Sequence, residues 1–259
     1  MLNEIFSDSF AHRKNYLTEV DARTKMLFVA LAIIIIVSSW NFYVPLIAFF
    51  LSLALLLGIR IPLRIILLRL ANPLSIAVVL FLIHIFFYGI TPIVELDIGG
   101  WHLVGYKEGL LRGFLIMGKV IATVSLVIFL SMTTPVNKLL NAARWFKVPH
   151  TWVEIAMLSY RYIFVLLEDA ITVRDAQKVR LGYSSLARSL KSLGELVGAT
   201  VIRAYDRSVA AYEAMMLRGY NGTIQSTVWE EKFSIKDTIT AVVFIVILAS
   251  LLALNALPI

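Results

Sequence analysis

The sequence predicts an all-α membrane protein with about five transmembrane helices and long cytoplasmic amphipathic helices. Its 259 residues are 59% apolar and only 16% charged, which is too apolar for an ordinary soluble domain. The charged residues are also segregated. They leave uncharged stretches of 34 residues between Lys25 and Arg60, 25 between Arg69 and Glu95, 18 between Lys119 and Lys138, and 22 after Asp237.

These uncharged stretches have the length of membrane spans, because a bilayer core of ~30 Å is crossed by about 20 helical residues. The first stretch would form a helix of about 51 Å, too long for one span. We therefore expect a turn at residues 38–41 (Ser-Ser-Trp-Asn) between two short spans. The predicted spans are 26–40, 42–58, 73–91, 110–132 and 238–257. Prolines are expected mostly at span edges: Pro45, Pro62, Pro73, Pro135, Pro149 and Pro258.

Three regions follow from this pattern: a membrane region at 1–132, a cytoplasmic region at 133–235 and a final transmembrane helix at 236–259. Residues 1–25 carry mixed charges without an early apolar core, so we interpret them as a cytoplasmic lead-in, with no signal peptide needed. The chain has no cysteine, which excludes disulfides and thiolate metal sites.

The positive charges predict the orientation, because Lys and Arg accumulate on the cytoplasmic side of a membrane. With the N-terminus inside, 21 of the 24 Lys and Arg residues are cytoplasmic. The predicted outer loop, 92–109, has one lysine against three acidic residues. We therefore expect a multi-pass protein of the cell (inner) membrane with its C-terminus outside. The net charge of +7 is mostly this bias, so nucleic-acid binding is a poor explanation.

The cytoplasmic region is expected to form three helices, at 136–147, about 151–181 and about 185–218. The third has an apolar stripe at steps of three and four residues, which is typical of one continuous helix face. The residues of this apolar stripe are Leu186, Leu190, Leu193, Val197, Val201, Tyr205, Val209, Tyr212 and Met216. Such a face suggests docking, either to the chain's own spans or to another subunit.

Two glycine patterns have alternative interpretations. Gly105, Gly109 and Gly113 lie four apart before and within the fourth span, and Gly194 and Gly198 repeat the spacing in the third cytoplasmic helix. Either pattern could mark a tight helix crossing or be ordinary small residues. The stretch 113–120 (GFLIMGKV) resembles a P-loop, but a valine replaces the hydroxyl residue and no strand precedes it. We therefore predict no ATP binding by this chain.

Lys119 and His84 are ionisable residues inside predicted spans. Lys119 either has a function, facing other helices or water, or extends to the outer surface. His84 either contacts a ligand or forms a hydrogen bond within the helix packing. No pattern predicts a metal site or a cofactor. A catalytic constellation is also missing, so we do not expect an enzyme.

Two cytoplasmic helices end with an arginine and a following glycine, at 175–182 (DAQKVRLG) and 214–219 (AMMLRG). Arg180 and Arg218 each have an alanine four residues earlier, Ala176 and Ala214. Guanidinium groups suit ion pairs with carboxylates across an interface. Alternatively, these arginines are only cations favoured at helix C-termini. Arg207 lies eleven residues before Arg218 on nearly the same face.

On these residues the chain resembles the transmembrane T component of energy-coupling factor (ECF) transporters, most closely the cobalt/nickel CbiQ type. That family has two short Ala-Arg-Gly-type signatures at the ends of two cytoplasmic coupling helices. The second is matched by residues 214–219 and the first more loosely by 176–180, because Leu181 follows the arginine where a small residue is usual. Residues 21–24 (DART), 133–135 (TTP), 147–149 (KVP) and 160–162 (YRY) with Glu168 also look similar.

The resemblance implies a non-enzymatic coupling subunit of an ATP-driven cobalt or nickel importer. Two ABC ATPase subunits would each receive one arginine-tipped helix, and a CbiM/NikM-like membrane S subunit would bind the metal. Arg180 and Arg218 would be the anchors, with Ala176, Ala214 and Gly219 allowing close approach. Arg207 and Met215 are secondary candidates. The alternative is a self-sufficient secondary transporter or channel, which the lack of inverted repeats and paired intramembrane charges disfavours.

Overall fold

The computed structural model describes the chain except for residues 1–17, 19, 60, 99–100, 223–234 and 256–259. The chain forms two compact units. Unit 1 contains residues 1–142 and 231–259, and unit 2 contains residues 143–230. The division falls within a short helix that begins directly after the fourth span, and each unit is described by itself below.

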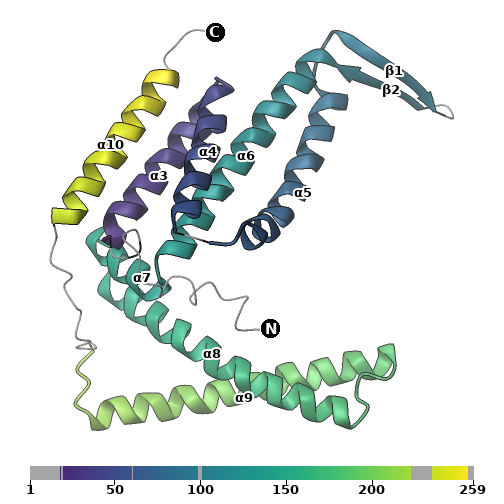
Figure 1. Ribbon diagram of the computed structural model, residues 1–259. Helices are drawn as coiled ribbons and strands as arrows, with labels where there is room; N and C mark the ends of the chain where they lie inside the picture. The colour runs from purple at the N-terminus through teal and green to yellow at the C-terminus, as the bar shows by residue number, and fades with distance from the viewer. Residues whose placement is uncertain (1–17, 19, 60, 99–100, 223–234, 256–259) are drawn as a thin grey trace. The chain divides into compact units, whose positions relative to one another are not determined.

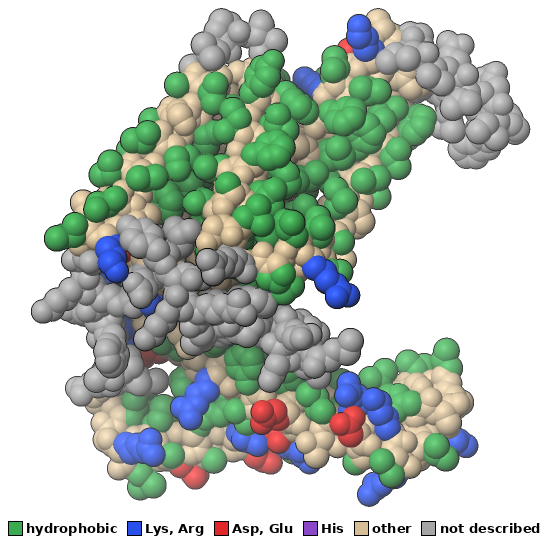
Figure 2. All heavy atoms as spheres, viewed as in Figure 1, with side chains coloured by type: hydrophobic (Ala, Val, Ile, Leu, Met, Phe, Trp, Pro, Cys, Tyr) green, Lys and Arg blue, Asp and Glu red, His purple; other side chains and the backbone are tan. Residues whose placement is uncertain are grey.

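Unit 1 is a bundle of apolar helices with a small β-hairpin at one end (Figure 1). Its elements are α3 (Ala22–Ser38), α4 (Tyr43–Gly58), α5 (Leu63–Phe87), β1 (Pro92–Ile98), β2 (Trp101–Tyr106), α6 (Lys107–Thr133) and α10 (Ile235–Asn255). Hydrophobic side chains cover much of the visible face of these helices (Figure 2). Among the described residues, α5, α6 and α10 are long and apolar enough to cross a membrane, and α4 is a shorter apolar helix. An all-α membrane protein is therefore confirmed.

The predicted turn in the first uncharged stretch is confirmed. Helix α3 ends at Ser38 and α4 begins at Tyr43. The Ser39 hydroxyl donates to the carbonyl of Asn41, and the Asn41 side-chain amide donates to the carbonyl of Leu254 in α10. The turn is thus held both locally and by the last helix of the unit.

The expected start of the third span at Pro73 was wrong. Helix α5 begins at Leu63, after Pro62 at its N-cap, and Pro73 lies inside the helix. Proline removes a single main-chain donor, and transmembrane helices tolerate this loss because neighbouring groups satisfy the freed carbonyl. The apolar residues on both sides of Pro73 therefore continue as one helix of 25 residues.

Two strands were missed in the predicted outer loop, 92–109. Strands β1 and β2 pair antiparallel, with Leu96 opposite Leu103 and Ile98 opposite Trp101. The segment 92–98 alternates apolar and polar residues only in part and contains two acidic residues, so its composition favoured a loop. Helix α6 consequently begins at Lys107, closely after the hairpin, instead of at residue 110.

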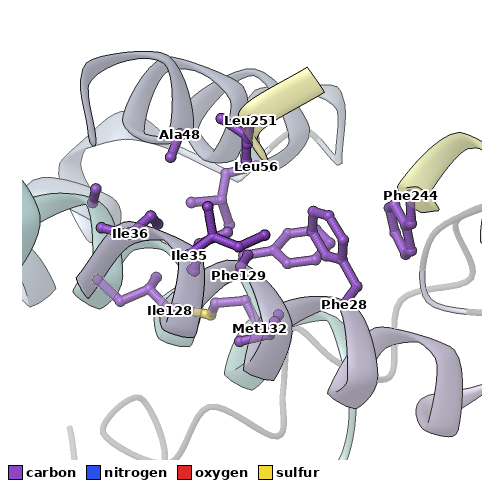
Figure 3. Close-up of a cluster of buried hydrophobic side chains, with 14 of the residues drawn as sticks. Phe28, Ile35, Ile36, Ala48, Leu56, Ile128, Phe129, Met132, Phe244 and Leu251 are labelled. Atoms are coloured by element: carbon purple, nitrogen blue, oxygen red, sulfur yellow. The ribbon is translucent and has the colours of Figure 1, made fainter. Parts of the chain in front are cut away.

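A buried apolar cluster holds α3, α4, α6 and α10 together (Figure 3). The rings of Phe28 in α3 and Phe244 in α10 stack with their centres 4.1 Å apart. Phe129 and Met132 from α6 and Leu56 from α4 are fully buried in the same cluster. Close packing of this kind, together with hydrogen bonds between helices, holds helices together inside a bilayer.

Polar contacts join three helix ends of unit 1. Asp21 caps α3 by accepting from the amide of Arg23, and its own amide donates to the Asp237 carboxylate at the start of α10. The ammonium of Lys25, which is fully buried, donates to the carbonyl of Thr133 at the end of α6. These contacts fix the starts of α3 and α10 beside the end of α6.

Two glycines of the fourth span make a tight helix crossing. A Cβ atom added at Gly109 would clash with the carbonyl oxygens of His84 in α5 and of Tyr88 at the C-cap of α5. At Gly113 it would lie 2.9 Å from the ring of Phe81. Gly105 lies in β2 instead of the helix. The spacing of 109 and 113 thus brings the backbones of α5 and α6 together.

Unit 2 consists of two long helices, α8 (His150–Val179) and α9 (Leu186–Leu217), preceded by α7 (Val136–Trp145), which crosses the division between the units. The three helices predicted for residues 133–235 are confirmed to within a few residues. Helices α8 and α9 are joined by a short turn and pack on each other (Figure 1). The two helices therefore end at well-separated places, since the 32 residues of α9 extend for about 48 Å.

Candidate functional site

The end of α8 positions Arg180 at its C-cap. The amide of Leu181 donates to the carbonyl of Lys178, and the amide of Gly182 donates to that of Gln177 at 2.8 Å. Leu181 has a φ of +58°, in the left-handed region. This combination is a Schellman motif, which satisfies the last carbonyls of a helix and reverses the chain. We call residues 176–182 the α8 tip.

The end of α9 repeats this arrangement around Arg218, which is again the C-cap residue. The amide of Gly219 donates to the carbonyl of Met216, and that of Tyr220 donates to Met215 at 3.1 Å. Gly219 has a φ of +81°. Residues 214–220, the α9 tip, therefore form a second Schellman motif with an arginine at the same position.

The two tips correspond residue by residue with an offset of 38 positions. Ala176 corresponds to Ala214 and Arg180 to Arg218, and all four residues are exposed. Leu181 and Gly219 occupy the same left-handed position, so the departure at Leu181 does not change the backbone of the tip. Within the described part of the chain, the structure records no ion pair or side-chain hydrogen bond for either arginine.

The α8 tip is braced by the start of α9. The hydroxyl of Ser192, a buried residue, donates to the carbonyl of Gly182 at 2.9 Å. The side-chain amide of Gln177 donates to the carbonyl of Ser192, and the Tyr183 hydroxyl donates to the Gln177 side chain. Ser185 caps α9 by accepting from the amide of Arg188. Sequence reasoning missed Ser192, since one serine among polar residues on a helix carries no distinguishing signal.

The α9 tip is open by comparison. A Cβ atom added at Gly219 would meet no atom within 4 Å, and the same holds for Gly222. Gly219 is therefore required for its left-handed backbone and not for lack of space. Ala214 and Met216 flank this end as exposed residues. A partner could thus approach Arg218 without displacing any described part of the chain.

Arg207 and Met215 lie in a groove between α8 and α9 instead of on the free surface of a tip. The guanidinium of Arg207 donates to the Asp169 carboxylate of α8 at 2.8 Å. The groove has a volume of about 480 Å³, and Met215, Ala211 and Tyr162 are among the residues that line it. This pairing of α8 with α9 was not predicted from the sequence, because it joins residues 38 positions apart.

The apolar stripe of α9 is exposed along its whole length. The exposed fraction ranges from 41% at Val209 to 80% at Leu186. A Cβ atom added at Gly194 or Gly198 would meet nothing within 4 Å, so no described part of the chain crosses the helix there. Helix α8 therefore packs against a different face of α9, and the predicted docking face is unoccupied within the described residues.

A comparison with protein families identifies the group to which this architecture belongs. The family model CbiQ, described as "Cobalt transport protein", matches residues 13–228. The chain belongs to the CbiQ family. The matched region includes α3 to α9, and thus both tips. The resemblance to the transmembrane T component of ECF transporters is confirmed, and this family is a membrane component of transporters, not an enzyme family.

Individual CbiQ-type relatives cover most of the chain. An uncharacterized protein of Methanocaldococcus jannaschii is 35% identical over 89% of this chain and 86% of its own length. The protein named "Energy-coupling factor transporter transmembrane protein EcfT" of Staphylococcus aureus is 26% identical over 98% of both chains. In Methanocorpusculum labreanum, "Putative fused cobalt transport protein CbiMQ" is 32% identical over 80% of this chain and 35% of its own length.

Proposed function

We propose that this CbiQ-family chain is the coupling (T) subunit of an ATP-driven ECF-type importer of cobalt or nickel ions. In this proposal, the chain transmits the movement of two ABC ATPase subunits to a CbiM/NikM-like S subunit, which binds the metal. The observation that carries the proposal is the equivalence of the two tips. Two separate helices present an exposed arginine at the same position of the same capping motif.

The distance between the tips fits two separate ATPase contacts. The α8 tip adjoins the start of α9, and the α9 tip follows 32 helical residues, or about 48 Å, later. One partner surface of ordinary size would not reach both arginines, whereas a pair of identical subunits presents the same surface twice. Each unpaired guanidinium would form charge-assisted hydrogen bonds with a carboxylate of one ATPase subunit.

The other candidate residues have distinct roles in this proposal. Ala176, Ala214 and Gly219 present little side chain beside the arginines, so they allow close approach of the ATPase. Arg207 and Met215 act indirectly, because they fix α9 against α8 through the Asp169 ion pair and the groove. A push on either tip would therefore move both helices together.

The apolar stripe of α9 would hold the S subunit. Exposed apolar surface that the chain does not cover itself marks an interaction site. Gly194 and Gly198 lie beside the stripe and would allow a helix of the partner to approach closely. The occurrence of a relative named as a fusion, CbiMQ, supports a close association with a CbiM-type subunit.

The membrane orientation follows the charges. We propose a cytoplasmic N-terminus, a cytoplasmic region at 133–235, and a C-terminus outside the cell (inner) membrane, because this places 21 of the 24 Lys and Arg residues inside. Both tips then face the compartment that contains ATP. Labelling of single introduced cysteines at residues 188 and 257 from the two sides of the membrane tests this orientation, since the chain has no native cysteine.

Reversing both tip charges tests the coupling role. The double variant Arg180→Glu with Arg218→Glu is expected to lose co-purification with the ATPase subunits and ATP-dependent cobalt or nickel uptake. The matched control is Arg161→Glu with Arg203→Glu, which makes the same charge change at exposed positions in the middle of α8 and of α9, away from both tips. A complete complex with normal uptake in the tip variant would contradict the proposal.

A second measurement separates this function from a self-sufficient transporter or channel. Proteoliposomes that contain only this chain are expected to take up no cobalt or nickel, and uptake should require the ATPase and S subunits with ATP. Uptake by the chain alone would support the alternative.

A further inference from the structure

A recess in unit 1 brings together ionisable residues that the coupling proposal does not use. It has a volume of about 630 Å³ and is lined by the end of α3, the end of α5 and the first half of α6. Lys119, Arg112 and His84 are in its lining, and none of the described residues that line it is acidic. An uncompensated pair of cations within membrane-spanning helices indicates an anionic ligand.

The recess results from a difference in helix length. Helices α3 and α4 have 17 and 16 residues, so each extends for about 25 Å, which is less than the ~30 Å of a bilayer core. Helices α5 and α6 have 25 and 27 residues and extend for about 40 Å. The turn between α3 and α4 therefore stops short of the last residues of α5 and the first residues of α6. Residues 38–40 of this turn line the recess.

Lys119 lies at the level of this turn. Its ammonium donates to the carbonyl of Val37 at 2.8 Å and thereby supplies a cation to the C-terminal end of α3. An ammonium has three donors, so two remain for a ligand. The sequence left open whether Lys119 faces other helices or extends to the surface, and the structure shows that it contacts α3.

Arg112 lies about two helical turns before Lys119, nearer the start of α6. The spacing of seven residues puts Arg112 and Lys119 on the same helix face, about 10 Å apart along the axis. The guanidinium carbon of Arg112 lies 4.4 Å from the centre of the Tyr88 ring, which holds the side chain by a cation–π contact. Stacking of this kind covers one face of the planar guanidinium and leaves the N–H groups at its edge for an anion.

His84 adds a polar group to the same wall. Its Nδ1 lies 2.9 Å from the carbonyl of Leu80 and must donate, because a carbonyl only accepts. In the neutral ring Nε2 is then an acceptor that suits a hydroxyl group. The recess thus offers two cationic donors and one acceptor, while Leu111, Leu115 and Ile116 supply an apolar lining.

We propose that this recess binds the headgroup of an anionic phospholipid, with the phosphate held by Lys119 and Arg112. The short α3–α4 turn would place the phosphate at the level of Lys119, and the acyl chains would leave past the exposed ring of Trp40, a residue typical of membrane interfaces. A lipid is the occupant because two of the helices that line the recess, α5 and α6, are long and apolar enough to cross a membrane, and because much of the lining is apolar. This assignment is independent of the proposed coupling function.

Native mass spectrometry of the full chain, released from nanodiscs with equal phosphatidylglycerol and phosphatidylcholine, tests the assignment. We expect selective retention of phosphatidylglycerol, reduced about tenfold by Arg112→Gln or Lys119→Gln, since each variant removes a charge-assisted contact. Lys119→Arg should retain the lipid. Lys107→Gln, the same kind of change on α6 outside the recess, should have no effect.

Three outcomes would overturn the assignment. Equal retention of both lipids by the unaltered chain would mean that the recess is not selective for an anion. Unchanged retention of phosphatidylglycerol in Arg112→Gln would also overturn the assignment. This variant can be tested even if Lys119→Gln does not fold, because it keeps the contact of Lys119 with α3. Displacement of the lipid by millimolar inorganic phosphate would assign the recess to a free anion.

Discussion

Leu181 and Gly219 follow Arg180 and Arg218 with the same left-handed backbone, at φ values of +58° and +81°. Glycine is the usual residue at this position of a Schellman motif, and a leucine there is uncommon. The loose match of the first signature in the sequence is therefore a difference of side chain and not of conformation. Because the backbone is equivalent, each arginine occupies the same C-cap position of the same motif.

Substitutions at these two positions should have opposite effects on the tips. Gly219→Leu is expected to destabilise the α9 tip by about 1 kcal/mol, because a side chain disfavours the left-handed conformation. The amides of residues 219 and 220 should then exchange with deuterium roughly fivefold faster. Leu181→Gly removes the same penalty from the α8 tip and should leave exchange there unchanged or slower. Faster exchange in Leu181→Gly would contradict the assigned strain.

Ser192→Ala should loosen the α8 tip alone. The variant removes the hydrogen bond to the carbonyl of Gly182, which is expected to cost about 1 kcal/mol locally. Hydrogen exchange at residues 180–184 should accelerate while residues 218–220 are unaffected. Ser189→Ala is the matched control, since that hydroxyl bonds only within its own helix. Equal effects at both tips would show that Ser192 does not brace the α8 tip specifically.

The ion pair between Asp169 and Arg207 should contribute little to stability. Both side chains are partly exposed, at 24% and 43%, and such pairs contribute about 0.2–1 kcal/mol. A double-mutant cycle with Asp169→Asn and Arg207→Gln is expected to give a coupling energy in this range by chemical denaturation. The charge-swapped variant, Asp169→Arg with Arg207→Asp, should restore most of it. A coupling energy above about 2 kcal/mol would indicate a larger role than an exposed pair can have.

Gly109→Ala should separate α5 from α6. The added methyl group would meet the carbonyl oxygens of His84 and Tyr88, which are main-chain atoms and cannot rotate away. We expect a loss of about 1–3 kcal/mol, the usual effect of overpacking, measured as a lower unfolding temperature in detergent. Gly118→Ala on the same helix is the control. Its Cβ would lie 3.7 Å from Pro45, so it should be neutral or slightly stabilising.

The length and segregation of the apolar stretches determined much of this protein by themselves. A run of 34 uncharged residues must turn within a bilayer, and the turn lies at the predicted residues. The period of the apolar stripe and the prolines at 135 and 149 determined the three helices of residues 133–235, because a helical period and a helix break depend only on residues close together in the sequence. The two helix-terminal arginines were visible in the sequence for the same reason.

Only the tertiary structure decided the contacts between residues far apart in the chain. These contacts are the pairing of Arg207 with Asp169, the brace from Ser192 to Gly182, and the contact of Lys119 with Val37 beside the recess. All of them depend on which faces of which helices pack together in the folded chain. A helical period shows that a residue faces a partner, but it contains no information on which partner. The left-handed turn at Leu181 likewise depends on the brace from Ser192 to Gly182, because leucine alone does not favour that conformation.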